Sequence, residues 1–144
     1  MRLAVIGAGP AGLTCVKQAL ADGHDVVCFE KHQALGGIWN PASGGAYAGV
    51  RMQSSRMSMP FSDHAPTFTA DFPTQAEVQE YLASYAETFG LLESVRFGQE
   101  VVEVAKDGAH WRVTARDMRD GTTRSEQVEA VLVANGELWR PRMP

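Results

Sequence analysis

A glycine-rich turn near the N-terminus constrains this chain more than any other feature. Residues 4–12 read AVIGAGPAG, an apolar run that ends in the spacing Gly7-x-Gly9-x-x-Gly12. This order predicts a buried strand, a tight turn and a helix whose first N–H groups attract a pyrophosphate. In such a turn Gly7 permits the sharp bend, Gly9 lets the backbone approach the phosphates, and Gly12 lets the helix pack closely on the strand. The sequence therefore predicts a dinucleotide-binding domain of the α/β class.

An acidic residue stands where this type of domain needs one. Glu30 follows the second predicted strand, Asp25–Phe29. We expect its carboxylate to accept hydrogen bonds from both ribose hydroxyls and to repel a phosphate on the 2′ oxygen. Pro10 suits the first helical turn, where its missing N–H costs nothing. FAD or NAD therefore fits better than NADP.

A secretory signal peptide is the competing interpretation of the N-terminus. Arg2, the apolar stretch and the small residues around Ala19-Leu20-Ala21 resemble one. Glycines and a proline interrupt the apolar region, however, and this interpretation leaves Glu30 unexplained. No segment approaches the roughly 20 apolar residues of a membrane span. We expect a cytoplasmic protein with no membrane span.

The composition favours one domain with a small-molecule ligand. The chain has 144 residues, of which 44% are hydrophobic, so we expect residues 1–144 to form a single domain with no second one. The net charge is −4, from 13 basic and 17 acidic residues, with no basic stripe for nucleic acid.

The cysteines and histidines predict neither a disulfide nor a metal site. Cys15 and Cys28 form no C-x-x-C pair, so we expect both to be reduced core residues, which argues against a disulfide reductase. The four histidines, at positions 24, 32, 64 and 110, are scattered, which favours solvated side chains over metal ligands.

A second glycine pair, Gly36-Gly37, precedes Ile38 and Trp39. It predicts another close approach of backbone to ligand, with Trp39 as a flat apolar wall. A surface turn with a half-buried Trp39 is the alternative. From Asn40 to Phe72 no periodicity persists, and a segment of this length is usually functional or disordered.

The remaining elements follow from periodicity. Thr74-Gln75-Ala76-Glu77 has the pattern of a capping box and predicts a helix over 74–89, whose aromatic stripe we assign to the core. Residues 99–128 contain three alternating segments joined by Asp-Gly turns and predict an antiparallel β-meander. The apolar run Ala130–Ala134 predicts a buried parallel strand that returns to the main sheet.

Four blocks of sequence resemble the flavin-containing monooxygenases, or class B flavoprotein monooxygenases. They are GAGPAGL at 7–13, Glu30 followed by GGIW at 36–39, FPTQAEVQEYLASYAETFGL at 72–91, and VLVANGELWRPRMP at 131–144. The blocks have the order and spacing of that family. The resemblance implies a Rossmann-like FAD-binding domain with a parallel sheet.

The resemblance also implies the site residues. The segment Tyr47–Arg56 with Phe61-Ser62-Asp63 is similar to the stretch that lies over the flavin ring. Gln53 stands where many members have an Asn that helps to hold the oxygenated flavin, which implies a catalytic role for Gln53. Asn135 replaces the usual Thr of the last turn. The full set implied to bind FAD is Gly7, Gly9, Pro10, Ala11, Gly12, Glu30, Lys31, Gly37, Ile38, Trp39, Gln53, Asn135 and Gly136.

For a complete member, the resemblance implies reduction of FAD by NADPH, capture of O2 as a C4a-(hydro)peroxyflavin, and oxygen transfer to a soft nucleophile or a carbonyl substrate. Residues 1–144 contain no second GxGxxG motif for NADPH. The chain is therefore incomplete relative to the family, and we expect it to be inactive alone. Another FAD/NAD(P)-dependent oxidoreductase and a non-catalytic dinucleotide-binding module are the alternatives.

Overall fold

The computed structural model describes residues 1–136, and the end of the fourth family-like block, 137–144, lies outside them. The two helices are α1 (Pro10–Ala21) and α2 (Gln75–Thr88). The strands are β1 (Arg2–Ile6), β2 (Asp25–Glu30), β3 (Val95–Phe97), β4 (Gln99–Asp107), β5 (His110–Asp117), β6 (Thr123–Val128) and β7 (Ala130–Val133). Short 3-10 turns lie at Gly37–Trp39, Pro41–Ser43 and Leu91–Ser94.

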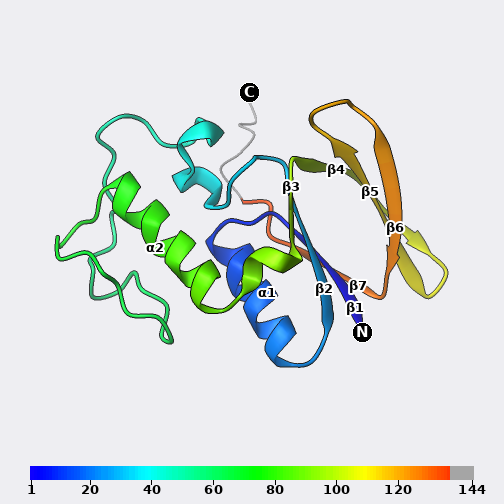
Figure 1. Ribbon diagram of the computed structural model, residues 1–144, viewed down its shortest axis with the longest axis horizontal. Coiled ribbons are helices and arrows are strands. Elements are labelled where there is room, and N and C mark those ends of the chain that lie inside the picture. The colour runs from blue at the N-terminus through cyan, green and yellow to red at the C-terminus, as the bar shows by residue number, and fades with distance from the viewer. Residues whose placement is uncertain (137–144) are drawn as a thin grey trace, which may run out of the picture.

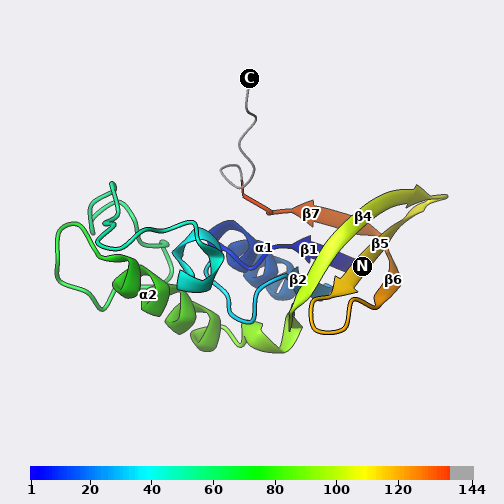
Figure 2. The same cartoon turned by 90° about the horizontal axis from the view of Figure 1, so that it is seen from above.

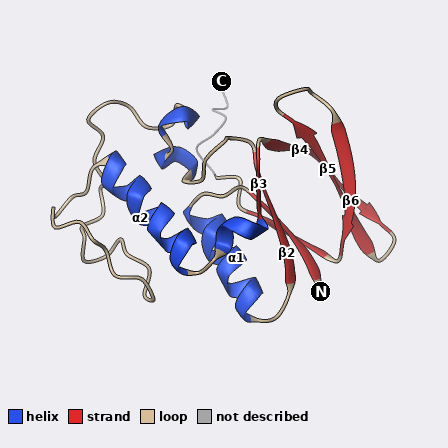
Figure 3. Cartoon of the chain, in the orientation of Figure 1, coloured by secondary structure: helices blue, strands red, loops and turns tan. Residues whose placement is uncertain are grey.

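The strands form two sheets with different directions. The first is parallel with the order β3-β2-β1-β7, and the second is the antiparallel meander β4-β5-β6. Figures 1 and 2 show the helices on one side of the parallel sheet and the meander on the other. Figure 3 shows the same separation by element type. The predicted α/β class, parallel sheet and meander are confirmed.

The side chains of β1 point alternately to the two faces of the parallel sheet and join two separate hydrophobic clusters. Leu3 and Val5 point toward the helices and join a cluster with Leu13, while Ala4 points toward the meander and joins a second cluster with Val113. Successive side chains of a strand point to opposite faces, so a sheet covered on both sides needs apolar residues at every position. This explains the continuous apolar run before the glycine turn.

Helix α2 begins as its sequence predicts. The Thr74 hydroxyl accepts a hydrogen bond from the Glu77 N–H, and the Glu77 carboxylate accepts one from the Thr74 N–H, which completes the capping box. Tyr81 and Tyr85 are buried, as the aromatic stripe predicts. The Tyr81 hydroxyl donates to the His64 carbonyl at 2.9 Å and so fastens the long loop to the helix.

Two expectations need correction, and one strand was missed. Strand β7 joins the parallel sheet as predicted and pairs with β1, but it is an edge strand, and Leu132 and Val133 are 36% and 68% exposed rather than buried. Strand β3 was not predicted, because three residues are too few to show a period. His64 is only partly exposed to solvent, because its ring packs on Tyr81 and Tyr85.

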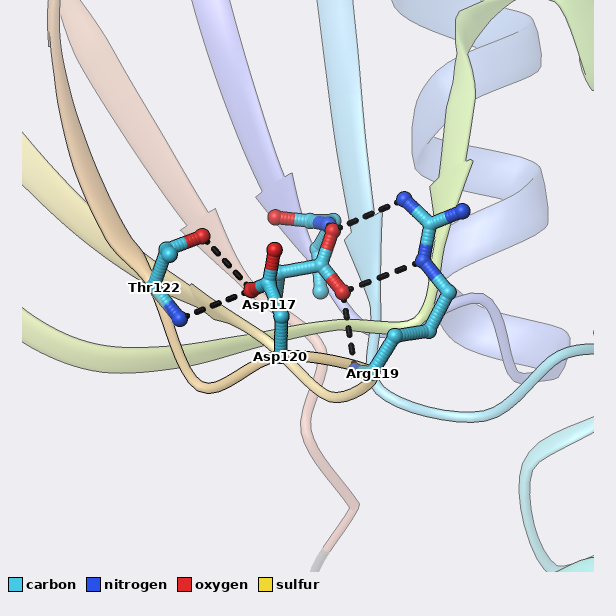
Figure 4. Close-up of polar contacts among 5 residues, drawn as sticks. Asp117, Arg119, Asp120 and Thr122 are labelled. Carbon is cyan, nitrogen blue, oxygen red and sulfur yellow. Dashed lines mark hydrogen bonds and ion pairs between the residues drawn. The ribbon is translucent and has the colours of Figure 1, made fainter.

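The turn between β5 and β6 is held by two aspartates (Figure 4). Asp117 accepts hydrogen bonds from the Arg119 backbone N–H at 2.8 Å and from its guanidinium at 3.0 Å. Asp120 accepts from the Thr122 N–H at 2.9 Å. The Arg119 hydrogen bonds hold the pKa of the Asp117 carboxyl well below its usual range, and the Thr122 bonds lower that of Asp120.

We predict that this turn loses stability in acid. A carboxyl whose pKa is lower in the folded state contributes stability above its unfolded pKa, and that contribution is lost as the pH falls through the folded value. At pH 7 Asp117→Asn should therefore unfold at lower urea concentration than the wild type. The difference should shrink steadily below about pH 4, where the unfolded carboxyl takes up its proton. A difference in urea midpoint that stays constant between pH 7 and pH 2 would contradict this role of Asp117.

Candidate functional site

The N-terminus of α1 has no side-chain cap. Gly9 occupies the cap position in an extended conformation, Pro10 follows at the first helical position, and no side chain bonds the first-turn N–H groups. These groups have no acceptor within the helix. The N-terminus of α2, by contrast, is filled by its own capping box. Of the two helices, α1 therefore has the free N–H groups that can donate hydrogen bonds to an anion.

The three glycines of the turn differ in whether packing would tolerate a side chain in their place. A methyl group on Gly12 would lie 1.8 Å from the Gly7 carbonyl oxygen, so helix and strand meet too closely for any side chain. Gly7 has φ +100°, and a methyl group there would lie 2.6 Å from the Ala134 carbonyl oxygen. A methyl group on Gly9 would meet only the Gly37 backbone, with Cα at 3.4 Å and the nitrogen at 3.7 Å, which are ordinary contacts. Packing therefore requires glycine at positions 7 and 12 but tolerates a small side chain at position 9.

Glu30 is a buried carboxylate at the end of β2. It is 4% exposed. Its Oε2 accepts a hydrogen bond from the Ala8 N–H at 2.8 Å, and its Oε1 accepts one from the His32 N–H at 2.8 Å. Each carboxylate oxygen has two lone pairs, so each can accept one further hydrogen bond. Glu30 therefore fixes the glycine turn and keeps acceptor capacity for a ligand.

The second glycine pair packs directly on the first turn. The Gly36 N–H donates to the Ala8 carbonyl at 2.9 Å. A methyl group on Gly37 would lie 3.1 Å from Gly9 Cα, and both Gly36 and Gly37 have positive φ. Two backbone segments without side chains thus face each other beside the start of α1.

Three other predicted cofactor residues lie on the segment that follows β2. Lys31 is half-buried directly after Glu30, and Ile38 is 38% exposed. Trp39 is half-buried and packs against the core cluster around α1 and α2. One side of Trp39 therefore packs on the core, and its predicted contact with the cofactor stays a prediction.

The remaining predicted residues fall in two places. Asn135 and Gly136 are exposed and follow β7, where a methyl group on Gly7 would lie 3.5 Å from Asn135 Cα. Both therefore lie at the same end of the sheet as the glycine turn. Gln53 is exposed on the long loop, two residues after Arg51, whose backbone forms a bridge with Thr74. Within residues 1–136 no hydrogen bond joins Gln53 to the glycine turn.

Sequence reasoning missed two backbone contacts that support the segment after Glu30. The Gly98 N–H donates to the His32 carbonyl at 3.0 Å, and the Met118 N–H donates to the Gly98 carbonyl at 2.8 Å. The β5–β6 turn of Figure 4 is thus linked by backbone to the end of β2. Gln75 and Gln79 of α2 also donate hydrogen bonds to backbone carbonyls of this segment. These links join residues far apart in the sequence, and only the isolated Gly98 could have suggested one.

Cys28 lies under the turn but is not a nucleophile. Burial, followed by the nearby Glu30 charge, raises the pKa of its thiol to about 12. Its Sγ donates to the Gly7 carbonyl at 3.6 Å. The thiol is therefore protonated at neutral pH and packs as a small apolar group. Over residues 1–136 no cluster of three metal-ligating side chains is found, and no helix is long and apolar enough to cross a membrane.

Comparison with known proteins identifies the family. The profile described as flavin-binding monooxygenase-like matches residues 1–144. The chain belongs to this family. Flavin-containing monooxygenase 5 of Rattus norvegicus is 36% identical over 155 aligned residues, which cover 99% of this chain and 29% of the rat protein.

Solved structures of monooxygenases share the fold. S-allyl-L-cysteine S-oxygenase from Allium sativum superposes with a TM-score of 0.89 at 30% identity, covering 99% of this chain and 38% of that one. A closed crystal structure of cyclohexanone monooxygenase gives a TM-score of 0.83 at 28% identity, covering 99% of this chain and 27% of that one. The chain thus spans about a third of the length of these flavin monooxygenases.

We predict that two glycine substitutions separate packing from ligand access. Gly12→Ala should lower the free energy of unfolding by about 3 kcal/mol, because its methyl group overlaps the Gly7 carbonyl. Gly9→Ala should leave stability unchanged or raise it by up to about 1 kcal/mol, because φ is negative there and the added methyl group has room. Urea unfolding of both variants is the measurement. Equal destabilisation by the two substitutions would show that position 9 is also a packing site.

Proposed function

We propose that this chain binds FAD through the glycine turn and serves a flavin-dependent monooxygenase. The observation that carries the proposal is the uncapped start of α1. The backbones of Gly9 and Gly37 face each other beside it, and the buried acid Glu30 bonds the turn that leads into it. Membership of the flavin-binding monooxygenase-like family supports the same cofactor.

The residues present fit FAD. A pyrophosphate needs N–H donors and close backbone approach, and the first turn of α1, including Ala11 and Gly12, supplies both. A ribose needs an acceptor for its hydroxyls, and each Glu30 oxygen has one lone pair left after its backbone hydrogen bond. A side chain at Gly9 would stand where the phosphates approach. The long loop around Gln53 is the segment we assign to the flavin ring and to a role in oxygen chemistry.

The proposed reaction is the NADPH- and O2-dependent oxygenation of a small molecule. Bound FAD supplies the redox chemistry, in that it takes electrons from NADPH and delivers them to O2. The chain's own residues bind and orient the cofactor. The names of the structural neighbours, an S-oxygenase and a cyclohexanone monooxygenase, favour a soft sulfur nucleophile or a ketone as substrate.

The first test is nucleotide preference. In calorimetric titrations the purified chain should bind FAD more tightly than NADP, because Glu30 repels a 2′-phosphate. Gly9→Ala should keep its fold, because the added methyl group makes only ordinary contacts with Gly37. It should bind FAD at least tenfold more weakly, because the second glycine of this motif lets the backbone approach the pyrophosphate. Tighter binding of NADP than of FAD, or unchanged FAD affinity in Gly9→Ala, would contradict the proposal.

The second test concerns the buried acid. Glu30→Gln keeps the shape of the side chain but turns one acceptor oxygen into a donor, which must then face either the Ala8 or the His32 N–H. We expect a loss of about 1–3 kcal/mol in the free energy of unfolding and a weaker affinity for FAD. The exposed control Glu87→Gln should change neither quantity. Wild-type stability and affinity in Glu30→Gln would show that the carboxylate does not organise the turn.

The third test is catalytic competence. With FAD added, residues 1–144 alone should oxidise NADPH far more slowly than a complete family member. These residues contain one GxGxxG motif, and holding a nicotinamide against the flavin can be worth roughly 7–11 kcal/mol of barrier. Stopped-flow mixing with NADPH measures the rate. Flavin bleaching at several per second would show that residues 1–144 themselves hold the nicotinamide.

A further inference from the structure

Two glutamines of α2 contact the segment that carries the second glycine pair. Gln75 and Gln79 are four residues apart and so lie on the same face of the helix. The Gln79 Nε2 donates to the Leu35 carbonyl at 2.9 Å, and the Gln75 Nε2 donates to the Trp39 carbonyl. The two amides thus hold the residues immediately before and after Gly36, Gly37 and Ile38.

The segment held in this way touches the glycine turn. The Gly36 N–H donates to the Ala8 carbonyl at 2.9 Å, and the Ala8 N–H donates to Glu30 Oε2 at 2.8 Å. Gly37 faces Gly9 across a distance that leaves room for no large side chain. A displacement of Gly36 and Gly37 would therefore widen the gap beside the start of α1.

The side-chain oxygen of Gln79 is left without a partner within the described part of the chain, while its Nε2 holds Leu35. This oxygen, Oε1, is buried. An unpaired buried acceptor is unfavourable. The same oxygen would lie 1.9 Å from a methyl group on Gly36, so the amide occupies the space that glycine leaves free. Gln79 and Gly36 are thus fitted to each other.

We propose that Gln75 and Gln79 are positioning residues that hold the Leu35–Trp39 segment against the glycine turn and thereby shape the pyrophosphate cradle. The proposal rests on the proposed FAD function. The helical amides act on the ligand only through the loop. They are separate from the aromatic stripe of α2, whose buried tyrosines pack in the core.

The double variant Gln75→Met/Gln79→Met tests this proposal, because methionine keeps the length of glutamine and removes the donor. Gln18→Met, at an exposed position of α1, is the matched control. The first measurement is amide hydrogen exchange without cofactor. Exchange at Gly36 should accelerate at least tenfold in the double variant, while the Ala134 N–H, which donates to the Ile6 carbonyl in the sheet, should exchange at the wild-type rate. A purely structural role would accelerate both amides together.

The second measurement is FAD affinity, followed by flavin fluorescence. The double variant should bind FAD at least tenfold more weakly than the wild type, and Gln18→Met should bind as the wild type does. If the double variant does not fold, the single variant Gln79→Met is compared in the same way, with a smaller change in the same direction expected.

The outcomes separate this proposal from the FAD proposal. Unchanged exchange at Gly36 overturns the positioning role whatever the chain binds. Wild-type FAD affinity in a variant whose Gly36 amide is exposed overturns the link between loop and cradle but leaves FAD binding intact. A wild-type chain that binds no FAD overturns the proposed function, and in that case the exchange result still decides whether the glutamines hold the loop.

Discussion

The hydrogen bonds between the Glu30 carboxylate and two backbone N–H groups connect most of the parts of this site. One oxygen holds Ala8 in the middle of the glycine turn, and the other holds His32 at the start of the following segment. A buried carboxylate needs such donors, because a charge without partners is costly to remove from water. The same residue that the sequence assigns to ribose binding therefore also shapes the turn beside it.

Other contacts extend outward from this carboxylate. Ala8 accepts a hydrogen bond from Gly36, which belongs to the second glycine pair, and α2 holds that pair through its glutamines. On the other side His32 is tied to Gly98 and through it to Met118 in the β5–β6 turn. The helical layer and the meander layer thus both support the same end of the parallel sheet, where β1 and β2 finish. This arrangement explains why a site built mostly of glycine can keep its shape.

Local patterns predicted a large part of this architecture. The glycine spacing, the capping box at Thr74 and the Asp-Gly turns each act within a few residues, so the sequence alone indicates them. The sequence indicated less clearly why each position of the turn requires glycine. Gly12 was predicted to permit close packing, and the structure agrees, but the requirement for glycine at Gly7 comes partly from Ala134, which is far away in the chain.

Features that depend on long-range partners were missed or misjudged. The exposure of Val133 follows from the edge position of β7, and an apolar strand does not reveal whether it will lie at an edge. Strand β3 forms because β2 offers it a partner. Gln79 has no local signal, since its role depends on a loop that lies more than forty residues earlier.

The N–H groups at the start of α1 provide the most direct test of the account. In the free chain the amides of Ala11 and Gly12 have no side-chain cap, so they should exchange rapidly with solvent in residue-resolved NMR measurements. Saturating FAD should slow both by at least tenfold, because the pyrophosphate accepts hydrogen bonds from this turn. If FAD binds and protects other amides while those of Ala11 and Gly12 exchange as before, the glycine turn is not the phosphate cradle and the central claim is wrong.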